Sequence, residues 1–203
     1  MRFNHPLDRL LTTRSRVAVL RYLVLTGVEL SGRQIARALG VSPKPLNEVL
    51  TGLADEGVLV RRTVGKTHLF RVNRDNILVS ELLLPLFERE HKMLSVALEE
   101  VFTGLEGRVR SAVLYGSVGR GEEGPDSDLD LLIVTEDAAV PKILEDRAVD
   151  FLKRYGNILS PLVITLNELR HRYLEGDEFL REALAQGQVV FGESPLELLR
   201  GTG

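Results

Sequence analysis

Residues 115–134, YGSVGRGEEGPDSDLDLLIV, place a glycine-containing turn ahead of two aspartates that stand one residue apart at the start of an apolar run. Side chains alternate between the two faces of a β-strand, so Asp128 and Asp130 are expected to share one face, and Leu129, Leu131 and Ile133 the other. The segment before the turn, residues 111–115, also predicts a buried strand. The stretch therefore predicts two strands joined by a polar loop, with two carboxylates beside a flexible turn.

This stretch resembles the minimal nucleotidyltransferases of the DNA polymerase beta superfamily, in which Gly-Ser is followed, about ten residues later, by Asp, an apolar residue and Asp. The resemblance covers residues 107–193, and the matching positions are Gly116, Ser117, Arg120, Gly121, Ser127, Asp128 and Asp130. It implies an α/β (α+β) domain with a mixed sheet flanked by helices. It also implies nucleoside triphosphate binding, a divalent cation (Mg²⁺ or Mn²⁺), and transfer of a nucleoside monophosphate to a hydroxyl acceptor.

The chemistry of nucleotidyl transfer explains why these residue types stand together. Negative charge spreads over phosphoryl oxygens in the transition state, and divalent cations held by carboxylate oxygens neutralise it. Asp128 and Asp130 are therefore the candidate metal ligands and catalytic residues. The glycines let backbone N–H groups approach a triphosphate, and Ser117 and Arg120 can donate to its oxygens. Taken singly, the same residues also suit an ordinary turn and a solvated strand edge, with Arg120 paired to Glu122.

One expected acidic residue is missing. Active members of this family usually place a third carboxylate on the following strand, where it helps to hold the metal and activates the attacking hydroxyl. That strand is predicted within residues 157–165, NILSPLVIT, where Ser160 or a neighbour takes the position, and the nearest acids are Asp150 and Glu168. A serine cannot replace a carboxylate as base. Catalysis with two carboxylates, recruitment of another acid, and binding without turnover therefore all stay open.

The distribution of charge divides the chain into two parts. Residues 1–75 carry 13 Lys and Arg against 6 Asp and Glu, and the remaining residues carry 13 against 23. A basic front and an acidic back predict two units with different partners. The chain has no cysteine, which excludes thiolate metal sites and fits a reducing cytoplasm. The most apolar N-terminal stretch, VAVLRYLVLTGV, is too short to span a bilayer, and no signal peptide is expected. A cytoplasmic protein without a membrane partner is predicted.

Residues 1–76 predict a winged helix-turn-helix domain. Apolar residues recur at helical spacing in residues 14–26. A Ser-x-x-Gln capping box at residues 31–34 starts a second helix, and a Ser-Pro pair at residue 42 starts a third. Residues 58–73 then predict two strands around a glycine turn. Two short helices joined by a glycine-containing turn and followed by a basic hairpin are the pattern of this domain.

The order of these elements resembles the winged-helix DNA-binding domains of bacterial and archaeal regulators, over roughly residues 8–75. The resemblance implies that the third helix enters the major groove and that the hairpin lies along the phosphate backbone. The predicted contacts with double-stranded DNA are polar residues on the third helix and basic residues of the hairpin: Lys44, Asn47, Thr51, Arg61, Arg62, Lys66 and Arg71. Winged helices also dock proteins, and the third helix is not strongly basic, so a protein-binding role stays open.

Residues 77–106 predict a helical connector in which Pro85 is a break or kink. Residues 82–87 are apolar on too many sides for a lone surface helix, so they are expected to lie between the domains or to form a dimer contact. A homodimer is expected, because helix-turn-helix proteins commonly read two half-sites. The nucleotidyltransferase domain then occupies residues 107–203.

Within that domain, the pattern after the aspartate pair predicts four further elements. They are a helix at residues 141–155, a strand at 157–165, a helix at 177–187 and a short strand at 188–192.

Three functions follow from the sequence. The main hypothesis is an enzyme that transfers a nucleoside monophosphate to a hydroxyl on a protein or small molecule. The rival is a transcriptional regulator whose nucleotidyltransferase domain senses nucleotide without catalysis, favoured by the missing third carboxylate and the basic front. An antitoxin-like protein that modifies or masks a partner is the third, although a fused winged helix is not part of that pattern.

Overall fold

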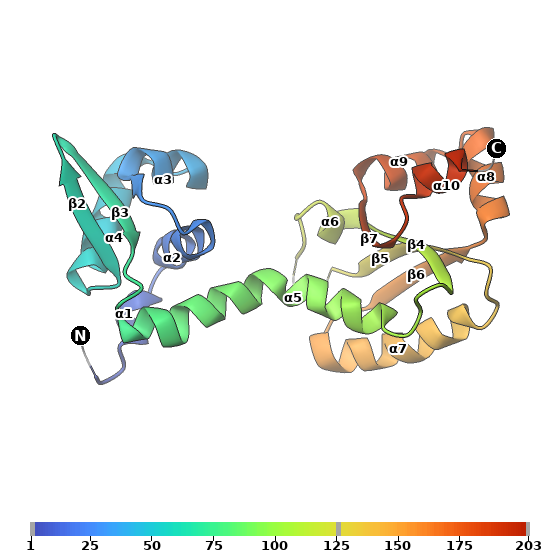
Figure 1. The fold of residues 1–203 in the computed structure, drawn as a ribbon, viewed down its shortest axis with the longest axis horizontal. Coiled ribbons are helices and arrows are strands. Elements are labelled where there is room, and N and C mark those ends of the chain that lie inside the picture. Colours follow the sequence, from blue (N-terminus) through green and yellow to red (C-terminus); the bar gives the residue numbers. More distant parts are fainter. Residues whose placement is uncertain (1–2, 125–126, 202–203) are drawn as a thin grey trace. The chain divides into compact units, whose positions relative to one another are not determined.

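Two units divide the chain, with the boundary between Met93 and Leu94. The computed structural model describes residues 3–124 and 127–201. Each unit has its own sheet and its own hydrophobic core (Figure 1). Residues 77–106, predicted as a separate connector, are instead shared between the units. Their first part, including Phe87, belongs to the N-terminal core, and their last part, including Phe102, belongs to the C-terminal core.

The N-terminal unit has the three predicted helices, α2 (Arg14–Thr26), α3 (Gly32–Leu39) and α4 (Pro43–Asp55), and a short helix, α1 (Leu7–Leu10), that the sequence did not predict. Ser31 accepts from the N–H of Gln34, whose side chain accepts from the N–H of Ser31, so the predicted capping box is confirmed. Gly40 ends α3 in the left-handed conformation, with φ at +65°. The turn between α3 and α4 therefore has the predicted chemistry.

The predicted wing is a two-stranded hairpin, β2 (Leu59–Val64) and β3 (Thr67–Val72). A short strand that the sequence did not predict, β1 (Leu30–Ser31), adds to it antiparallel, and the strand order is β1-β3-β2. The N-terminal core is formed by the inner faces of the helices and of the wing. Its fully buried side chains include Leu20, Leu23, Ile35, Leu50 and Leu53.

A π-helical turn, η1 (Val79–Leu83), leads into the long helix α5 (Leu84–Phe102). The N–H of Leu84 donates to the carbonyl oxygen of Val79, so α5 continues η1 without a gap, and Pro85, which has no backbone N–H, cannot add to this ladder of hydrogen bonds. The break predicted at Pro85 thus takes the form of a change from π-helix to α-helix just before it. Leu83 and Phe87 are buried, whereas Leu82 and Leu86 are about half exposed.

The C-terminal unit is a mixed four-stranded sheet between two layers of helices, which confirms the predicted α/β class. In chain order its elements are β4 (Val109–Tyr115), α6 (Gly116–Gly119), β5 (Leu129–Thr135), α7 (Val140–Tyr155), β6 (Leu159–Ile164), α8 (Leu166–Glu175), α9 (Glu178–Gln186), β7 (Gln188–Gly192) and α10 (Pro195–Arg200). The strand order is β6-β5-β4-β7, with β5 and β6 parallel and the other pairs antiparallel. The sequence predicted α7 and α9 but not α6, α8 or α10.

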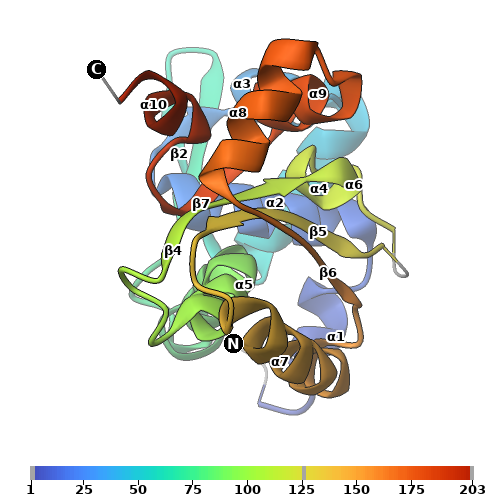
Figure 2. The same cartoon turned by 90° about the vertical axis from the view of Figure 1, so that its right-hand side faces the viewer.

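The helices cover the two faces of this sheet unequally. Helix α7 lies on one face, and α8, α9 and α10 lie on the other (Figures 1 and 2). Leu131 and Ile133 belong to the core on the α7 side, whereas Leu132 and Val134 belong to the core on the side of α8, α9 and α10. The predicted alternation along β5 is therefore confirmed, and Asp130 lies on the α9 side, the face of Leu132. No helix in the described part of the chain is long and apolar enough to cross a membrane.

Candidate functional site

The aspartate pair lies where β5 begins. In the sheet, Asp130 is in register with Tyr115 of β4 on one side and with Ser160 of β6 on the other. Residues directly opposite each other in neighbouring strands share a face of the sheet, so these three residues form a row on the α9 side. Asp128 precedes β5 by one residue and is exposed, whereas Asp130 is partly buried. The predicted metal ligands therefore stand at the end of a strand, beside the turn that follows β4.

Burial and neighbouring negative charge raise the pKa of two groups in this row, Asp130 and Tyr115. Burial, together with the charge of Asp128, raises the pKa of Asp130 above its usual value. Burial and the charge of Asp130 raise the pKa of Tyr115. Like charges that oppose each other's ionisation are stabilised when a cation joins them. The pair thus has the electrostatics of a cation site.

Gly116 brings the backbone turn against the carboxylate of Asp130. It begins α6 with φ at +72°, a conformation that favours glycine. A Cβ atom built at this position would lie 2.3 Å from Oδ2 of Asp130. Only glycine therefore allows this carboxylate and the start of α6 to approach so closely.

The two predicted serine ligands meet across the loop. The Ser117 hydroxyl donates to Oγ of Ser127 at 3.2 Å, and the N–H of Gly124 donates to the same oxygen at 2.9 Å. The side chain of Asn157 donates to the carbonyl oxygen of Ser127 at 2.9 Å. Ser127 thus holds the loop before β5 in place through three hydrogen bonds, one of them from the Ser117 hydroxyl of α6. Asp126 and Pro125, which belong to the predicted loop, lie outside the described residues.

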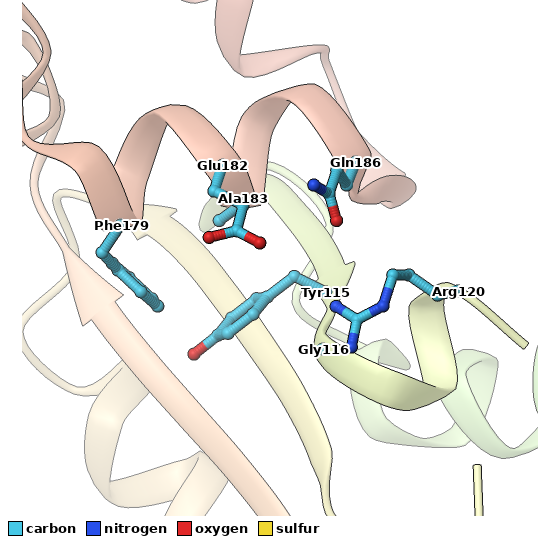
Figure 3. A pocket seen from close by; sticks show the side chains of 7 residues that line it. All are labelled: Tyr115, Gly116, Arg120, Phe179, Glu182, Ala183 and Gln186. Carbon is cyan, nitrogen blue, oxygen red and sulfur yellow. The ribbon is translucent and has the colours of Figure 1, made fainter. Parts of the chain in front are cut away.

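Arg120 follows α6 and is held by a neighbour. Its Nε donates to Oε2 of Glu122 at 2.9 Å, the surface pairing that the sequence left open. A guanidinium has five N–H donors, so its two Nη groups stay available, and the side chain extends over the pocket beside α6 (Figure 3). Gly121 has φ at +68° and its N–H donates to the carbonyl oxygen of Val118 at 3.0 Å. The Nη groups of Arg120 can therefore donate to an anion. The hydrogen bond from Gly121 closes the turn.

A pocket of about 190 Å³ opens beside this turn. It is lined by residues of β4 and α6 on one side and of α9 on the other: Tyr115, Gly116, Arg120, Phe179, Glu182, Ala183 and Gln186 (Figure 3). Phe179 packs edge-on against Tyr115, with ring centroids 5.3 Å apart and planes at 82°. The sequence did not identify the α9 residues as part of the site. Their spacing places them on one helix face, but the spacing does not say what that face meets.

The position of the third carboxylate is taken by Ser160, as the sequence suggested, because Ser160 is the residue of β6 in register with Asp130. The other acids considered have partners of their own: Asp150 pairs with Lys153 at 3.1 Å, and Glu168 pairs with Arg172 at 3.7 Å. Among the residues that the structure describes, no three His, Asp or Glu side chains gather to hold a metal. Mg²⁺ commonly binds through one or two carboxylates, with water and substrate phosphates as its other ligands. Asp128 and Asp130 fit that kind of site.

Comparison with known proteins identifies the C-terminal unit. Residues 97–183 match the family described as "Nucleotidyltransferase domain". Most of the C-terminal unit therefore matches this family model. A relative from Methanocaldococcus jannaschii, named "Putative protein adenylyltransferase MJ0604", is 28% identical over 102 residues, which cover 50% of this chain and 98% of that protein. The match thus covers nearly the whole length of this relative but only about half of this chain.

Two solved structures resemble parts of the chain. The structure described as the AntR antimony-specific transcriptional repressor has 22% identity and a TM-score of 0.38, and covers 46% of this chain and 78% of that chain. A structure described as a toxin-antitoxin with AMP-PNP has 12% identity and a TM-score of 0.37, and covers 53% of this chain and 82% of that chain.

In the N-terminal unit, a hollow of about 660 Å³ lies between the helix-turn-helix and the wing. It is lined by Ser31, Gly32, Arg33, Asn47, Thr51, Lys66, Thr67, His68 and Phe70. Three predicted DNA contacts, Asn47, Thr51 and Lys66, therefore surround one surface, to which Arg33 adds a basic residue that the sequence did not single out. Lys44 is exposed in the first turn of α4, outside this lining.

The predicted basic residues of the wing do not form one cluster. Arg61 is in register with Phe70, so it lies on the wing face that borders the hollow. Arg62 lies on the opposite face, where its Nε donates to both carboxylate oxygens of Glu29 at 3.2 Å and its Nη2 donates to Oε2. The hydrogen bonds and charge of Arg62, with the charge of Arg71, lower the pKa of Glu29. Arg62 is therefore already paired, and Arg71 shares its face.

Proposed function

We propose that the nucleotidyltransferase domain transfers a nucleoside monophosphate from a nucleoside triphosphate to a hydroxyl acceptor, with a divalent cation (Mg²⁺ or Mn²⁺) bound by Asp128 and Asp130. The observation that carries this proposal is the approach of the Asp130 carboxylate to the backbone at Gly116. That approach places the Asp130 carboxylate against a glycine turn whose neighbour Arg120 offers free donors, and Asp128 stands two residues before Asp130 in the chain. Carboxylates, a glycine turn and an arginine together suit a triphosphate with its cation.

Each side chain has a task in this proposal. A divalent cation at the pair supplies the positive charge that stabilises the phosphoryl oxygens during transfer. Asp128 and Asp130 hold that charge in place from one end of β5. The Nη groups of Arg120 bind a phosphate oxygen, and Glu122 fixes the direction of the guanidinium through Nε. Ser160 offers no carboxylate, so the proton of the attacking hydroxyl leaves to water or to a base on the acceptor.

The sequence left open which nucleoside monophosphate is transferred and which molecule accepts it, and the relative's name favours one choice for each. It names a protein adenylyltransferase. We therefore propose adenosine monophosphate as the transferred group and a protein hydroxyl as the acceptor.

The experiment is a transfer assay with labelled nucleotide, comparing the parent chain with the double variant Asp128→Asn and Asp130→Asn. Asp150→Asn is the matched control, because Asp150 lies on α7, on the other face of the sheet, and pairs only with Lys153 in the described structure. Incorporated label should fall to background in the double variant and stay at the parent level in the control. Equal incorporation by parent and double variant would remove the proposed site.

The N-terminal unit is proposed to bind double-stranded DNA through α4 and the inner face of the wing. The polar and basic lining of the hollow supports this, with Asn47 and Thr51 on α4 and Lys66 on the wing. Lysine and arginine contacts with phosphate release counterions, so the affinity should fall steeply with salt. A homodimer in the cytoplasm, joined through the exposed Leu82 and Leu86, would present two such units to two half-sites.

A second function is favoured by Ser160, which stands beside Asp130 where a third carboxylate would assist catalysis. The protein would then be a transcriptional regulator whose nucleotidyltransferase domain binds nucleotide without turnover. DNA binding that responds to nucleotide in the absence of label transfer supports this alternative. A parent chain without salt-dependent DNA binding contradicts it.

A further inference from the structure

The pocket beside Gly116 has one wall formed by a single face of α9. Phe179, Glu182 and Gln186 are spaced by three and four residues, so they follow one another along that face. At 1.5 Å of rise per residue, the row from Phe179 to Gln186 is about 10 Å long. This is comparable with the length of a nucleoside from its phosphate-bearing carbon to the far edge of its base.

The two ends of the pocket differ in chemistry. Gln186 lies toward Arg120 and Gly116, and Phe179 lies at the other end beside the ring of Tyr115 (Figure 3). One end therefore offers N–H donors to an anion, and the other offers aromatic surface. A planar base packs well against an aromatic surface, regardless of which polar groups the base carries.

Glu182 lies between these ends, and its carboxylate extends from α9 into the pocket (Figure 3). Within the described residues it has no hydrogen-bond or ion-pair partner. An ionised carboxylate only accepts hydrogen bonds. The Glu182 carboxylate therefore suits a ligand that places an N–H donor beside it in the pocket.

We propose that this pocket holds the nucleoside part of the bound triphosphate, with the phosphates at the Arg120 end and the base against Phe179 and Tyr115. Glu182 accepts a hydrogen bond from an exocyclic amine of the base and so selects an amino-bearing base, such as adenine, over its oxo counterpart, hypoxanthine. The volume of about 190 Å³ is below the roughly 300–1,000 Å³ of sites that enclose a whole small molecule. A base fits inside, and the triphosphate extends out toward Asp128 and Asp130.

This inference rests on the proposed nucleotidyl transfer, and the probes separate the two. Isothermal titration calorimetry on the full chain with Mg²⁺ compares ATP, ITP and inorganic tripolyphosphate. ATP and ITP differ at the exocyclic group and at the neighbouring N1, which carries a hydrogen only in ITP, and tripolyphosphate has no base. The parent is expected to bind ATP about tenfold more tightly than ITP, the effect of one hydrogen bond to a charged group. In Glu182→Gln the ATP-to-ITP ratio should fall close to one, because an amide also donates to the oxo group. Glu178→Gln, on the same helix outside the pocket, should keep the parent ratio.

A second variant tests the aromatic end. Phe179→Leu should weaken ATP and ITP by a similar factor of several-fold and leave tripolyphosphate unchanged, because only the base loses its contact. Circular dichroism and thermal unfolding establish that each variant is folded. The inference is overturned if Glu182→Gln keeps the parent's ratio of ATP to ITP affinity, or if the parent binds ATP and ITP equally. In either case, binding of tripolyphosphate and of nucleotide would still support the metal site. A parent that binds none of the three probes overturns both proposals.

Discussion

The contact between Gly116 and Asp130 can be tested by adding one carbon atom. In Gly116→Ala, the new Cβ would lie 2.3 Å from Oδ2 of Asp130, whereas ordinary contact begins near 3.4 Å, so this oxygen must move by about 1 Å. The carboxylate can do so by rotating about its side chain, at little cost in stability. The backbone conformation adds a strain of about 1–2 kcal/mol, because alanine disfavours a φ of +72°.

Gly104→Ala is the matched control. Gly104 has a φ of +73°, and nothing lies within 4 Å of a Cβ built there, so the control carries the same strain without the clash. Urea denaturation should show that both variants lose a similar amount of unfolding free energy, about 1–2 kcal/mol. Only Gly116→Ala should lose metal-dependent label transfer, by about 100-fold, since a 1 Å displacement of a catalytic group has effects of that size.

The reasoning is refuted if Gly116→Ala transfers label within a few-fold of Gly104→Ala. In that case Asp130 would not need to lie against the turn. A loss of transfer that is equal in both variants would show that strain in the fold, and not the position of the carboxylate, is responsible.

Three further perturbations follow from contacts in the two units. Ser160→Asp places a third carboxylate in register with Asp130. Without a cation the added like charge should lower the melting temperature of the variant below that of the parent in EDTA, and Mn²⁺ should raise the melting temperature of the variant more than that of the parent. Equal increases on addition of Mn²⁺ would contradict this. Lys66→Gln removes a basic residue from the lining of the hollow, so fluorescence anisotropy with duplex DNA should show weaker binding and a salt slope that is shallower by about 0.9. Glu29→Gln, which frees Arg62 on the opposite face of the wing, should leave the slope at the parent value; an unchanged slope in Lys66→Gln would contradict the proposed surface. The N–H of Leu180 and the Arg172 guanidinium lower the pKa of Asp177, the residue that caps α9. Stability from this carboxylate is therefore complete above its unfolded value of 3.8 and is lost as the pH falls through the lower folded value. Asp177→Asn should be less stable than the parent at neutral pH, and the difference should shrink in acid unfolding curves below about pH 4.

Much of the fold could be predicted because local chemistry encodes it. The capping box at Ser31 and Gln34 and the left-handed Gly40 depend on neighbours within a few residues, so α3 and its turn were predicted correctly. The wing and the strands β4 and β5 show the expected alternation or apolar runs. Helix α8 was not predicted, although Thr165 caps it by accepting a hydrogen bond from the N–H of Glu168. Thr165 also ends the apolar run of the predicted strand at residues 157–165.

The arrangement of the wing shows where local patterns stop. Its basic residues are close in the sequence, which suggested one phosphate-binding cluster. Pairing in the hairpin puts Arg61 and Arg62 on opposite faces, and Glu29, more than thirty residues earlier, engages Arg62. Alternation along a strand already separates Arg61 from Arg62, but the position of Glu29 cannot be read from spacing within the wing.

By itself, the sequence determined that a glycine turn precedes two carboxylates at the start of a strand, because both features depend on the backbone preferences of adjacent residues. Only the tertiary structure decided that Ser160 lies beside Asp130 and that Glu182 and Phe179 of α9 form the opposite wall of the pocket. The pairing register of β6 and the packing of α9 on the sheet join segments that are distant in the chain. Such contacts are selected by the burial of the whole core, which no local pattern records.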